Sequence, residues 1–416
     1  MAESWRPPPG LDMGLDYVEE ISKYKPGGYH PVDIGDIINA NDCQYEVVHK
    51  LGYGGFSTVW LVRSCGDMRS YFALKILRAD VTESNELRIL QHLKTGDGPK
   101  HPNLITLYDS FTISGPNEHH QCLVFPALGP SLDNFRVAEE LPGPVRLHMC
   151  EQIASVLAFL HERGICHGDL TASNVAFEFP DIQPTSPDQL LEFLGPVRTE
   201  PVKRGNGPRS LDVPSISSHR PRQLVERAAV SGLDYSLFTR IRIVDFGQAF
   251  FVNDPPPSLG IPIDCFPPEL CFGYLPSKSS DIWDLACVIY QVHCHSLLFP
   301  TGFRVFEILI GTIVGYLGPL PQHWKGRFDF DKLGYWEPGK VKKEVEPVWW
   351  FEDKTSEKSI VSRLSTDAPH LTSYQQEELI RILHGMLVYE PNNRTSAEDV
   401  AKRLNTLVHS DQQSGG

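Results

Sequence analysis

Two stretches decide the fold of this chain: His167-Gly168-Asp169-Leu170-Thr171-Ala172-Ser173-Asn174 and, after the apolar run Ile241-Arg242-Ile243-Val244, Asp245-Phe246-Gly247. Asn174 follows Asp169 by five residues, so one short loop can present both side chains. Phosphoryl transfer from ATP needs a carboxylate to accept a hydroxyl proton, and an amide and a second carboxylate to hold magnesium against the phosphates. Asp169 is therefore the candidate base, and Asn174 and Asp245 are the candidate magnesium ligands.

A glycine-rich stretch precedes these motifs, at Leu51-Gly52-Tyr53-Gly54-Gly55-Phe56-Ser57-Thr58-Val59, between strand-like segments at residues 45–50 and 58–62. Glycine lets backbone approach phosphates closely, so a hairpin of this kind can cover a nucleotide. Gly-Gly is also a good signal for an ordinary hairpin turn. Ser57 stands where the third glycine of the nucleotide-binding pattern would be, so this stretch alone leaves both interpretations open.

A single lysine, Lys75, interrupts the apolar strand predicted over residues 71–77. An unpartnered buried lysine is costly, so the pattern predicts that ATP phosphates and a glutamate of the next helix are its partners. That helix is expected over residues 82–94, and we prefer Glu86 to Glu83 because an apolar helical pattern follows it.

The adenine side of the nucleotide site is predicted next to these elements. Residues 121–125 read as a strand that leads to a hinge, with the backbone of Pro126 and Leu128 facing adenine, and Ala73 is assigned to the same site. A plain buried strand would look identical, so this assignment depends on the order of the motifs.

The chain resembles a eukaryotic protein kinase from about residue 45 to about residue 408. Three further motifs carry the resemblance: Phe266-Pro267-Pro268-Glu269, Ser280-Asp281-Ile282-Trp283 and Asn393-Arg394-Thr395. In that family the first closes the activation segment, the second supplies an aspartate that braces the catalytic loop, and the third supplies an arginine that pairs with the closing glutamate. The resemblance implies an α+β, two-lobed kinase fold with a small β-rich N-lobe and a larger helical C-lobe.

Within protein kinases, the lead-in Gly27-Gly28-Tyr29-His30-Pro31-Val32-Asp33-Ile34-Gly35-Asp36, with residues 50–52 and 56–61, is similar to the SR-protein kinases, the SRPK family. These enzymes phosphorylate serines in Arg/Ser-rich segments of splicing factors. The resemblance implies a serine/threonine-protein kinase that uses ATP and Mg²⁺, takes basic or Arg/Ser-rich protein segments as substrate, and takes part in the regulation of mRNA splicing. It further implies a monomer in the cytoplasm, the nucleus or both.

The expected organisation is a tail and lead-in at residues 1–44, an N-lobe at 45–127, a C-lobe at 128–408 and a flexible tail at 409–416. The C-lobe is interrupted by inserts at about 180–234 and 301–365. The first is rich in proline, serine and arginine, which predicts a disordered or loosely attached segment; SR-protein kinases carry a spacer at this junction. The second is of a kind that serves as a docking surface in the group containing SRPK and MAP kinases. Tolerated surface loops would explain both inserts equally well.

Three positions depart from the family pattern. Gly168 replaces the arginine that reads an activation-loop phosphate, which implies activity without such phosphorylation. Thr171 replaces a lysine that touches the transferring phosphate, which would lower the rate. Phe266 replaces an arginine of the substrate-binding segment, which argues against strict specificity for Arg/Ser repeats.

The composition fits this interpretation. The formal net charge of -14 argues against direct nucleic-acid binding and favours basic peptides. The nine cysteines contain no Cys-x-x-Cys pair and are expected to be core thiols in a reducing compartment. No signal region or membrane-length apolar run is found. Two other classes remain open: a pseudokinase scaffold, suggested by the three departures, and a small-molecule kinase, whose catalytic loop resembles His-Gly-Asp-Leu-x-x-x-Asn.

Overall fold

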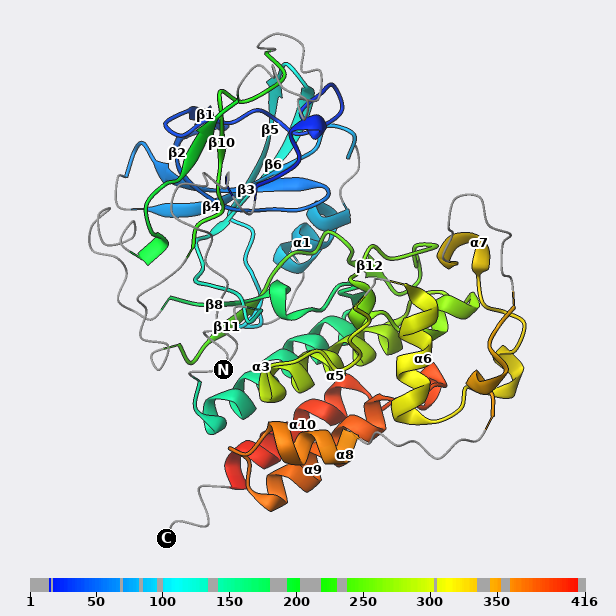
Figure 1. The fold of residues 1–416 in the computed structure, drawn as a ribbon. Coiled ribbons are helices and arrows are strands. Elements are labelled where there is room, and N and C mark those ends of the chain that lie inside the picture. The colour runs from blue at the N-terminus through cyan, green and yellow to red at the C-terminus, as the bar shows by residue number, and fades with distance from the viewer. Residues whose placement is uncertain are drawn as a thin grey trace, which may run out of the picture. The chain divides into compact units, whose positions relative to one another are not determined.

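The computed structural model describes residues 15, 18–67, 70–81, 85–95, 100–133, 141–179, 193–202, 218–229, 238–302, 305–334, 345–352 and 360–410. The chain forms two units (Figure 1). The first comprises Met1–Leu87, Thr106–Leu128 and Asp181–Leu233, and the second comprises Arg88–Ile105, Gly129–Pro180 and Asp234–Gly416. The motifs at residues 167–174 and 245–247 both belong to the second unit, whereas the segment Asp181–Leu233 between them belongs to the first.

A six-stranded antiparallel sheet forms the first unit, with strand order β1-β2-β3-β4-β6-β5 (Figure 1). Its strands are β1 (Ile37–Asn39), β2 (Gln44–Tyr53), β3 (Ser57–Ser64), β4 (Tyr71–Leu77), β5 (Asp109–Gly115) and β6 (Glu118–Pro126). The 3-10 helix η1 (Ile21–Lys23) precedes the sheet, and α1 (Asn85–Thr95) follows β4. The strands predicted around residues 45–50, 58–62, 71–77 and 121–125 are confirmed.

Side-chain alternation along β3 and β4 separates a core face from a functional face. Trp60 and Val62 of β3 and Leu74 and Ile76 of β4 are buried together in one apolar cluster. Successive strand residues point to opposite faces, so Lys75, between Leu74 and Ile76, projects from the other face of the sheet. The apolar pattern of β4 thereby positions its one charged side chain.

Part of the first predicted insert belongs to this sheet unit. β9 (Thr199–Pro201) and β10 (Gln223–Val225) pair antiparallel, and Val225 is 1% exposed within the core cluster of the sheet. The backbone N–H of Ala228 donates to the carbonyl of Lys50 at 2.9 Å. The hairpin is therefore an attached element of the fold.

Polar contacts hold the same hairpin to the lead-in. The Asp33 carboxylate accepts hydrogen bonds from the guanidinium and backbone N–H of Arg222 and from the backbone N–H of Gln223. The prediction of a disordered or loosely attached insert is wrong for residues 197–202 and 218–228. Residues 180–192, 203–217 and 230–234 of the insert lie outside the described residues. Average composition misled here, because a few apolar residues such as Val225 suffice to anchor a hairpin.

Helices dominate the second unit (Figure 1). They are α3 (Gly143–Glu162), α5 (Lys278–Cys294), α6 (Phe306–Leu317), α7 (Phe330–Leu333), α8 (Ile360–Asp367), α9 (Ser373–Met386) and α10 (Ala397–Ser410). Short 3-10 helices are η2 (Ala172–Asn174), η4 (Ile263–Cys265), η5 (Pro268–Phe272), η6 (Gln322–Trp324), η7 (Val348–Trp350) and η8 (Pro391–Asn393). The core helices predicted around residues 147–160 and 379–386 are confirmed as α3 and α9.

The helix α5 is almost wholly buried and begins at a defined residue. Ser277 caps its first turn and forms a capping box with Ser280: the Ser277 hydroxyl accepts the N–H of Ser279, and the Ser280 hydroxyl accepts the N–H of Ser277, both at 3.2 Å. The cap fixes where the first turn lies. Asp281 consequently lies near the start of the helix, where it is buried.

Candidate active site

Two short ladders present the catalytic motifs in the second unit. β7 (Ile165–Cys166) pairs with β12 (Phe250–Phe251), and β8 (Val175–Phe177) pairs with β11 (Ile241–Ile243). Val175 lies opposite Ile243, and the N–H of Val244 donates to the carbonyl of Asn174 at 2.9 Å. Asn174 and Asp245 therefore lie at the same end of the β8–β11 pair, although they are 71 positions apart in the sequence.

The structure brings Asp169 and Asn174 into direct contact. The Asn174 amide donates to the Asp169 carboxylate at 2.9 Å and to the Asp169 carbonyl at 2.8 Å. Both bonds use the nitrogen of the amide, so its oxygen stays available for a cation. The contact orients the candidate base and the candidate ligand together.

The backbone of Asp245 has a conformation that is uncommon for a residue other than glycine. Its φ of 61° lies in the left-handed region, which costs of order 1–3 kcal/mol for a residue with a side chain. Its carboxylate accepts the N–H of Gly247 at 3.0 Å. The neighbouring Phe246 is buried and packs on His167, with ring centroids 5.0 Å apart. Carboxylate and amide oxygens suit Mg²⁺, so Asp245 and Asn174 fit that ion chemically.

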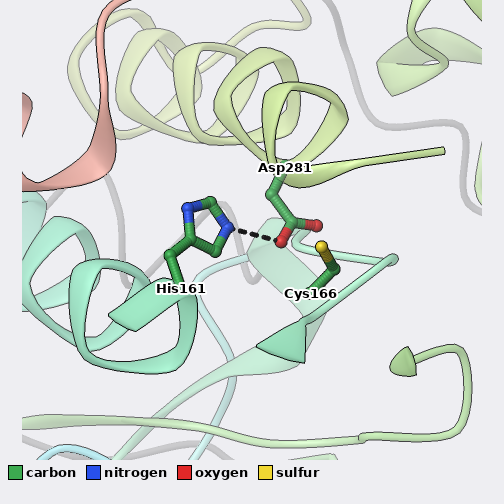
Figure 2. Close-up of side chains that lie close together, drawn as sticks. All are labelled: His161, Cys166 and Asp281. Atoms are coloured by element: carbon green, nitrogen blue, oxygen red, sulfur yellow. Dashed lines mark hydrogen bonds and ion pairs between the residues drawn. The ribbon is translucent and has the colours of Figure 1, made fainter. Parts of the chain in front are cut away.

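Asp281 of α5 holds the catalytic loop through hydrogen bonds to its backbone. Its carboxylate accepts the N–H of His167 at 2.9 Å and the N–H of Gly168 at 2.8 Å. It also contacts the ring of His161 at 2.9 Å, as Figure 2 shows, with Cys166 alongside. The predicted bracing role of Asp281 is present as these backbone hydrogen bonds.

The same three side chains are also the one group among the described residues whose spacing could admit a metal ion. Asp281 already has both oxygens engaged by backbone donors and by His161. Burial raises the pKa of the Cys166 thiol, so the thiolate that a metal would need is disfavoured. We therefore assign His161, Cys166 and Asp281 to the support of the catalytic loop and not to a metal centre.

Gly168 is required by the geometry of the loop. Its φ is +73°, and a Cβ at this position would lie 2.4 Å from the carbonyl oxygen of Gln248. No side chain fits there unless the backbone moves. The sequence showed only that an arginine is missing, whereas the structure shows why glycine stands in its place.

In the first unit, Lys75 and Glu86 form a buried ion pair. The ammonium of Lys75 contacts the two carboxylate oxygens of Glu86 at 2.8 and 2.7 Å. Glu86 lies in the first turn of α1, whose described part is Asn85–Thr95. Residues 82–84, including Glu83, lie outside the described residues. The structure thus joins the two residues that the sequence paired.

The glycine-rich stretch is a hairpin between β2 and β3. Gly52 lies opposite Val59 and Tyr53 opposite Thr58, which leaves residues 54–56 as the exposed tip. Further along the sheet, Ala73 of β4 lies opposite Phe125 of β6, and the chain leaves β6 at Pro126 toward Leu128. All the predicted nucleotide-binding positions thus lie on the hairpin, on β4 or at the end of β6.

The predicted closing pair of the activation segment is also formed. Arg394 meets the Glu269 carboxylate through two nitrogens, at 2.8 and 2.6 Å, with both side chains buried. Ser280 donates to the same carboxylate at 3.2 Å. Phe266 is buried against Phe306 of α6, with ring centroids 5.0 Å apart. Position 266 is therefore part of the apolar packing of the second unit.

Asp284 was missed by sequence reasoning. It lies one turn after Asp281 in α5, is 1% exposed, and neither carboxylate oxygen has a hydrogen-bond partner within the described residues. Burial, followed by the charges of neighbouring acidic groups, raises its pKa well above the usual range. The available signal was an acidic residue in the apolar run Ile282-Trp283-Asp284-Leu285-Ala286.

Known proteins resemble this chain over most of its length. A model of the protein kinase domain matches residues 45–182. The serine/threonine-protein kinase SRPK of Physarum polycephalum is 28% identical over 407 residues, which cover 92% of this chain and 89% of that protein. SRSF protein kinase 3 of Homo sapiens is 32% identical over 225 residues, 51% of this chain and 37% of the human protein. This chain is therefore similar to the SRPK-type serine/threonine-protein kinases and divergent from them in sequence.

Two further comparisons show how this SRPK-like kinase relates to others. It is 37% identical to the serine/threonine-protein kinase spk-1 of Caenorhabditis elegans over 186 residues, 40% of this chain and 17% of that protein. The crystal structure of the PF14_0431 kinase domain superposes with a TM-score of 0.57 at 20% identity, covering 90% of this chain and 98% of that one. That likeness supports the two-lobed kinase fold. Within the described residues, no helix of the kinase is long and apolar enough to cross a membrane.

Proposed function

We propose that this SRPK-like kinase transfers the γ-phosphate of ATP to serine hydroxyls in basic protein segments, Arg/Ser-rich segments among them. The observation that carries the proposal is the contact between Asp169 and Asn174 on a loop braced by Asp281. It places a candidate base and a candidate metal ligand together, as phosphoryl transfer requires. The formal net charge of -14 favours the approach of basic peptides.

Each of the candidate site residues has its own role in this reaction. Asp169 orients the serine hydroxyl and accepts its proton while the serine oxygen bonds to the γ-phosphorus and the bond from that phosphorus to the leaving ADP oxygen breaks. Lys75, held by Glu86, aligns the α- and β-phosphates. Asn174 and Asp245 would hold Mg²⁺, which, when bound, neutralises phosphate charge.

The substrate preference follows from position 266 as well as from charge. Phe266 brings no charge to the segment where the SRPK family usually carries arginine, and it is committed to packing on Phe306. We therefore propose a preference for basic serine-containing segments without strict selection for Arg/Ser repeats. A peptide array with labelled ATP tests this, using Arg/Ser repeats, basic non-repeat serines and proline-directed serines. Transfer confined to Arg/Ser repeats would contradict the relaxed preference.

The base is tested by Asp169→Ala. Phosphate transfer should fall by at least about a hundredfold, because a positioned acid or base contributes about that much or more. Binding of MgATP, measured by calorimetry, should remain close to that of the wild type. Unchanged transfer by the variant would refute the assignment of the base, and no transfer by the wild type to any peptide would favour a pseudokinase scaffold instead.

A further inference from the structure

We propose that Tyr29 and Arg78 are positioning residues that fix the tip of the glycine-rich hairpin for nucleotide binding. The inference rests on the proposed ATP-dependent function, in which residues 51–59 cover the phosphates. It gives a role to the lead-in around Gly27-Gly28-Tyr29, which the proposed chemistry leaves without one. All of these residues belong to the first unit.

Three consecutive carbonyls at the hairpin tip accept hydrogen bonds from outside the hairpin. The phenol of Tyr29 donates to the carbonyl of Gly54 at 2.5 Å. The guanidinium of Arg78 donates to the carbonyl of Gly55 at 3.0 Å, and the backbone N–H of Arg78 donates to the carbonyl of Phe56 at 2.9 Å. Two residues from separate segments thus hold every peptide unit of the tip.

Each of these bonds also sets the direction of an amide. A trans peptide unit is planar, and its C=O and N–H point in opposite directions. Holding the carbonyl of Gly54 therefore aims the N–H of Gly55, and holding the carbonyl of Gly55 aims the N–H of Phe56. Neither N–H donates a hydrogen bond within the described part of the chain. Both N–H groups therefore point away from the hydrogen bonds to Tyr29 and Arg78 and can donate to an anionic ligand.

Without these bonds the tip would keep one backbone hydrogen bond of its own, from the N–H of Gly54 to the carbonyl of Ser57 at 2.9 Å. Phe56 is 57% exposed, and a Cβ added to Gly54 or Gly55 would meet no atom within 4 Å. Glycines lose more conformational freedom on ordering than other residues, so a loose tip would lose binding energy when it closed on phosphates. Hydrogen bonds formed before the nucleotide arrives reduce that loss.

Tyr29 can act as a fixed donor because its own surroundings are rigid. It is 1% exposed, its ring packs edge to face on Tyr24 at 5.5 Å, and the Arg78 guanidinium lies 6.0 Å from the ring centroid. The amide of Asn117 donates to its carbonyl at 2.6 Å. A group that is locked by such contacts orients its neighbour more effectively than a mobile one.

The two glycines of the lead-in are needed to deliver Tyr29 to this place. Gly27 has a φ of +78°, and a Cβ at Gly28 would lie 1.9 Å from the carbonyl oxygen of Lys23. The carbonyls of Gly27 and Gly28 accept the N–H groups of Asp80 and Ala79, both at 3.0 Å. This tight turn therefore joins the lead-in to the segment that carries Arg78.

The test compares Tyr29→Phe with Tyr24→Phe in the full chain. Both changes remove one phenol hydroxyl from a buried ring, but the hydroxyl of Tyr24 goes to Glu19 and not to the hairpin. Tyr29→Phe should raise the dissociation constant of MgATP and the KM for ATP by about three- to tenfold, as expected for one hydrogen bond, with kcat within about twofold. Tyr24→Phe should lower the melting temperature and change neither constant.

Hydrogen exchange gives a readout that does not depend on activity. Amides 54–57 should exchange faster in Tyr29→Phe and at the wild-type rate in Tyr24→Phe. Should Tyr29→Phe fail to fold, Arg78→Met provides a second comparison, because it removes the guanidinium that bonds to Gly55, with its contacts to Asp80 and to the Tyr29 ring, and keeps the backbone bond to Phe56. Equal nucleotide affinity and equal exchange in the variants and the wild type would overturn the inference. A wild type that binds no nucleotide would instead refute the proposed function.

Discussion

Replacing Asp284 by asparagine should stabilise the protein, and the gain should grow with pH. The carboxyl group is 1% exposed and lacks a hydrogen-bond partner among the described residues, and burial raises its pKa well above the usual range. The folded chain therefore keeps a proton that the unfolded chain releases above about pH 4. Since the folded state binds more protons there, the free energy of unfolding falls as the pH rises toward the folded-state pKa.

The size of the effect follows from proton linkage. One group contributes about 1.4 kcal/mol for each pH unit between its two pKa values. Asp284→Asn preserves the shape of the side chain and does not titrate. Above about pH 4, the difference in unfolding free energy between the variant and the wild type should therefore grow by up to about 1.4 kcal/mol for each pH unit, until the pH passes the folded-state pKa of Asp284. Below about pH 4 the two proteins should have similar stability, because both side chains are then neutral.

Urea unfolding across this pH range measures the difference, with tryptophan fluorescence as the signal, since Trp283 is the residue before Asp284. Asp254→Asn is the matched control, because the Asp254 side chain is largely exposed. The control should show the same pH profile as the wild type. Parallel stability profiles for Asp284→Asn and the wild type would refute the reasoning, since they would mean that the buried carboxyl does not keep its proton.

Three further changes test other parts of the structure, each by denaturant unfolding. Arg394→Met should cost about 3–5 kcal/mol, because it leaves the buried Glu269 carboxylate without its partner, and adding Glu269→Leu should restore most of the loss; equal losses in the single and double variants would show that the pair is not the cause. Gly168→Ala should cost about 2 kcal/mol or more, because φ is +73° and the Cβ would lie 2.4 Å from the carbonyl oxygen of Gln248; wild-type stability would contradict the observed loop geometry. Val225→Ala should destabilise the first unit by about 2 kcal/mol, whereas Arg222→Ala, whose side chain is 72% exposed, should cost less; a larger loss from the arginine would mean that the insert hairpin is held by charge and not by burial.

Local patterns in the sequence were sufficient for most of the sheet and for the site motifs. The bounds of β4, Tyr71–Leu77, match the prediction because apolar residues surround a single lysine over one strand length. The Lys75–Glu86 pair was predictable because a buried lysine needs an anion and α1 offers Glu86 in its first turn. Such features depend on neighbours in sequence, and periodicity reports on those neighbours directly.

Contacts between distant residues could not be predicted in this way. The hydrogen bonds from Arg222 to Asp33 join residues 189 positions apart, and no local composition distinguishes that arginine from the others of a proline-rich insert. Whether a described donor lies within hydrogen-bond distance of the Asp284 carboxyl depends on the packing around it, which the sequence does not give. The φ of Gly168 likewise depends on the carbonyl of Gln248, which comes from another segment.

The catalytic loop shows why the missing arginine does not by itself make this protein a scaffold. The loop is held by Asp281 through the backbone N–H groups of His167 and Gly168, and a backbone donor is present whatever side chain stands at position 168. The close carbonyl of Gln248 excludes an arginine there, so at position 168 the loop meets the segment after Asp245 through backbone atoms. A phosphate has no side chain at position 168 to bind, and it can neither supply nor remove the hydrogen bonds that hold the loop. The geometry around Asp169 is therefore set by the folding of the second unit, and its support by Asp281 needs no arginine at position 168.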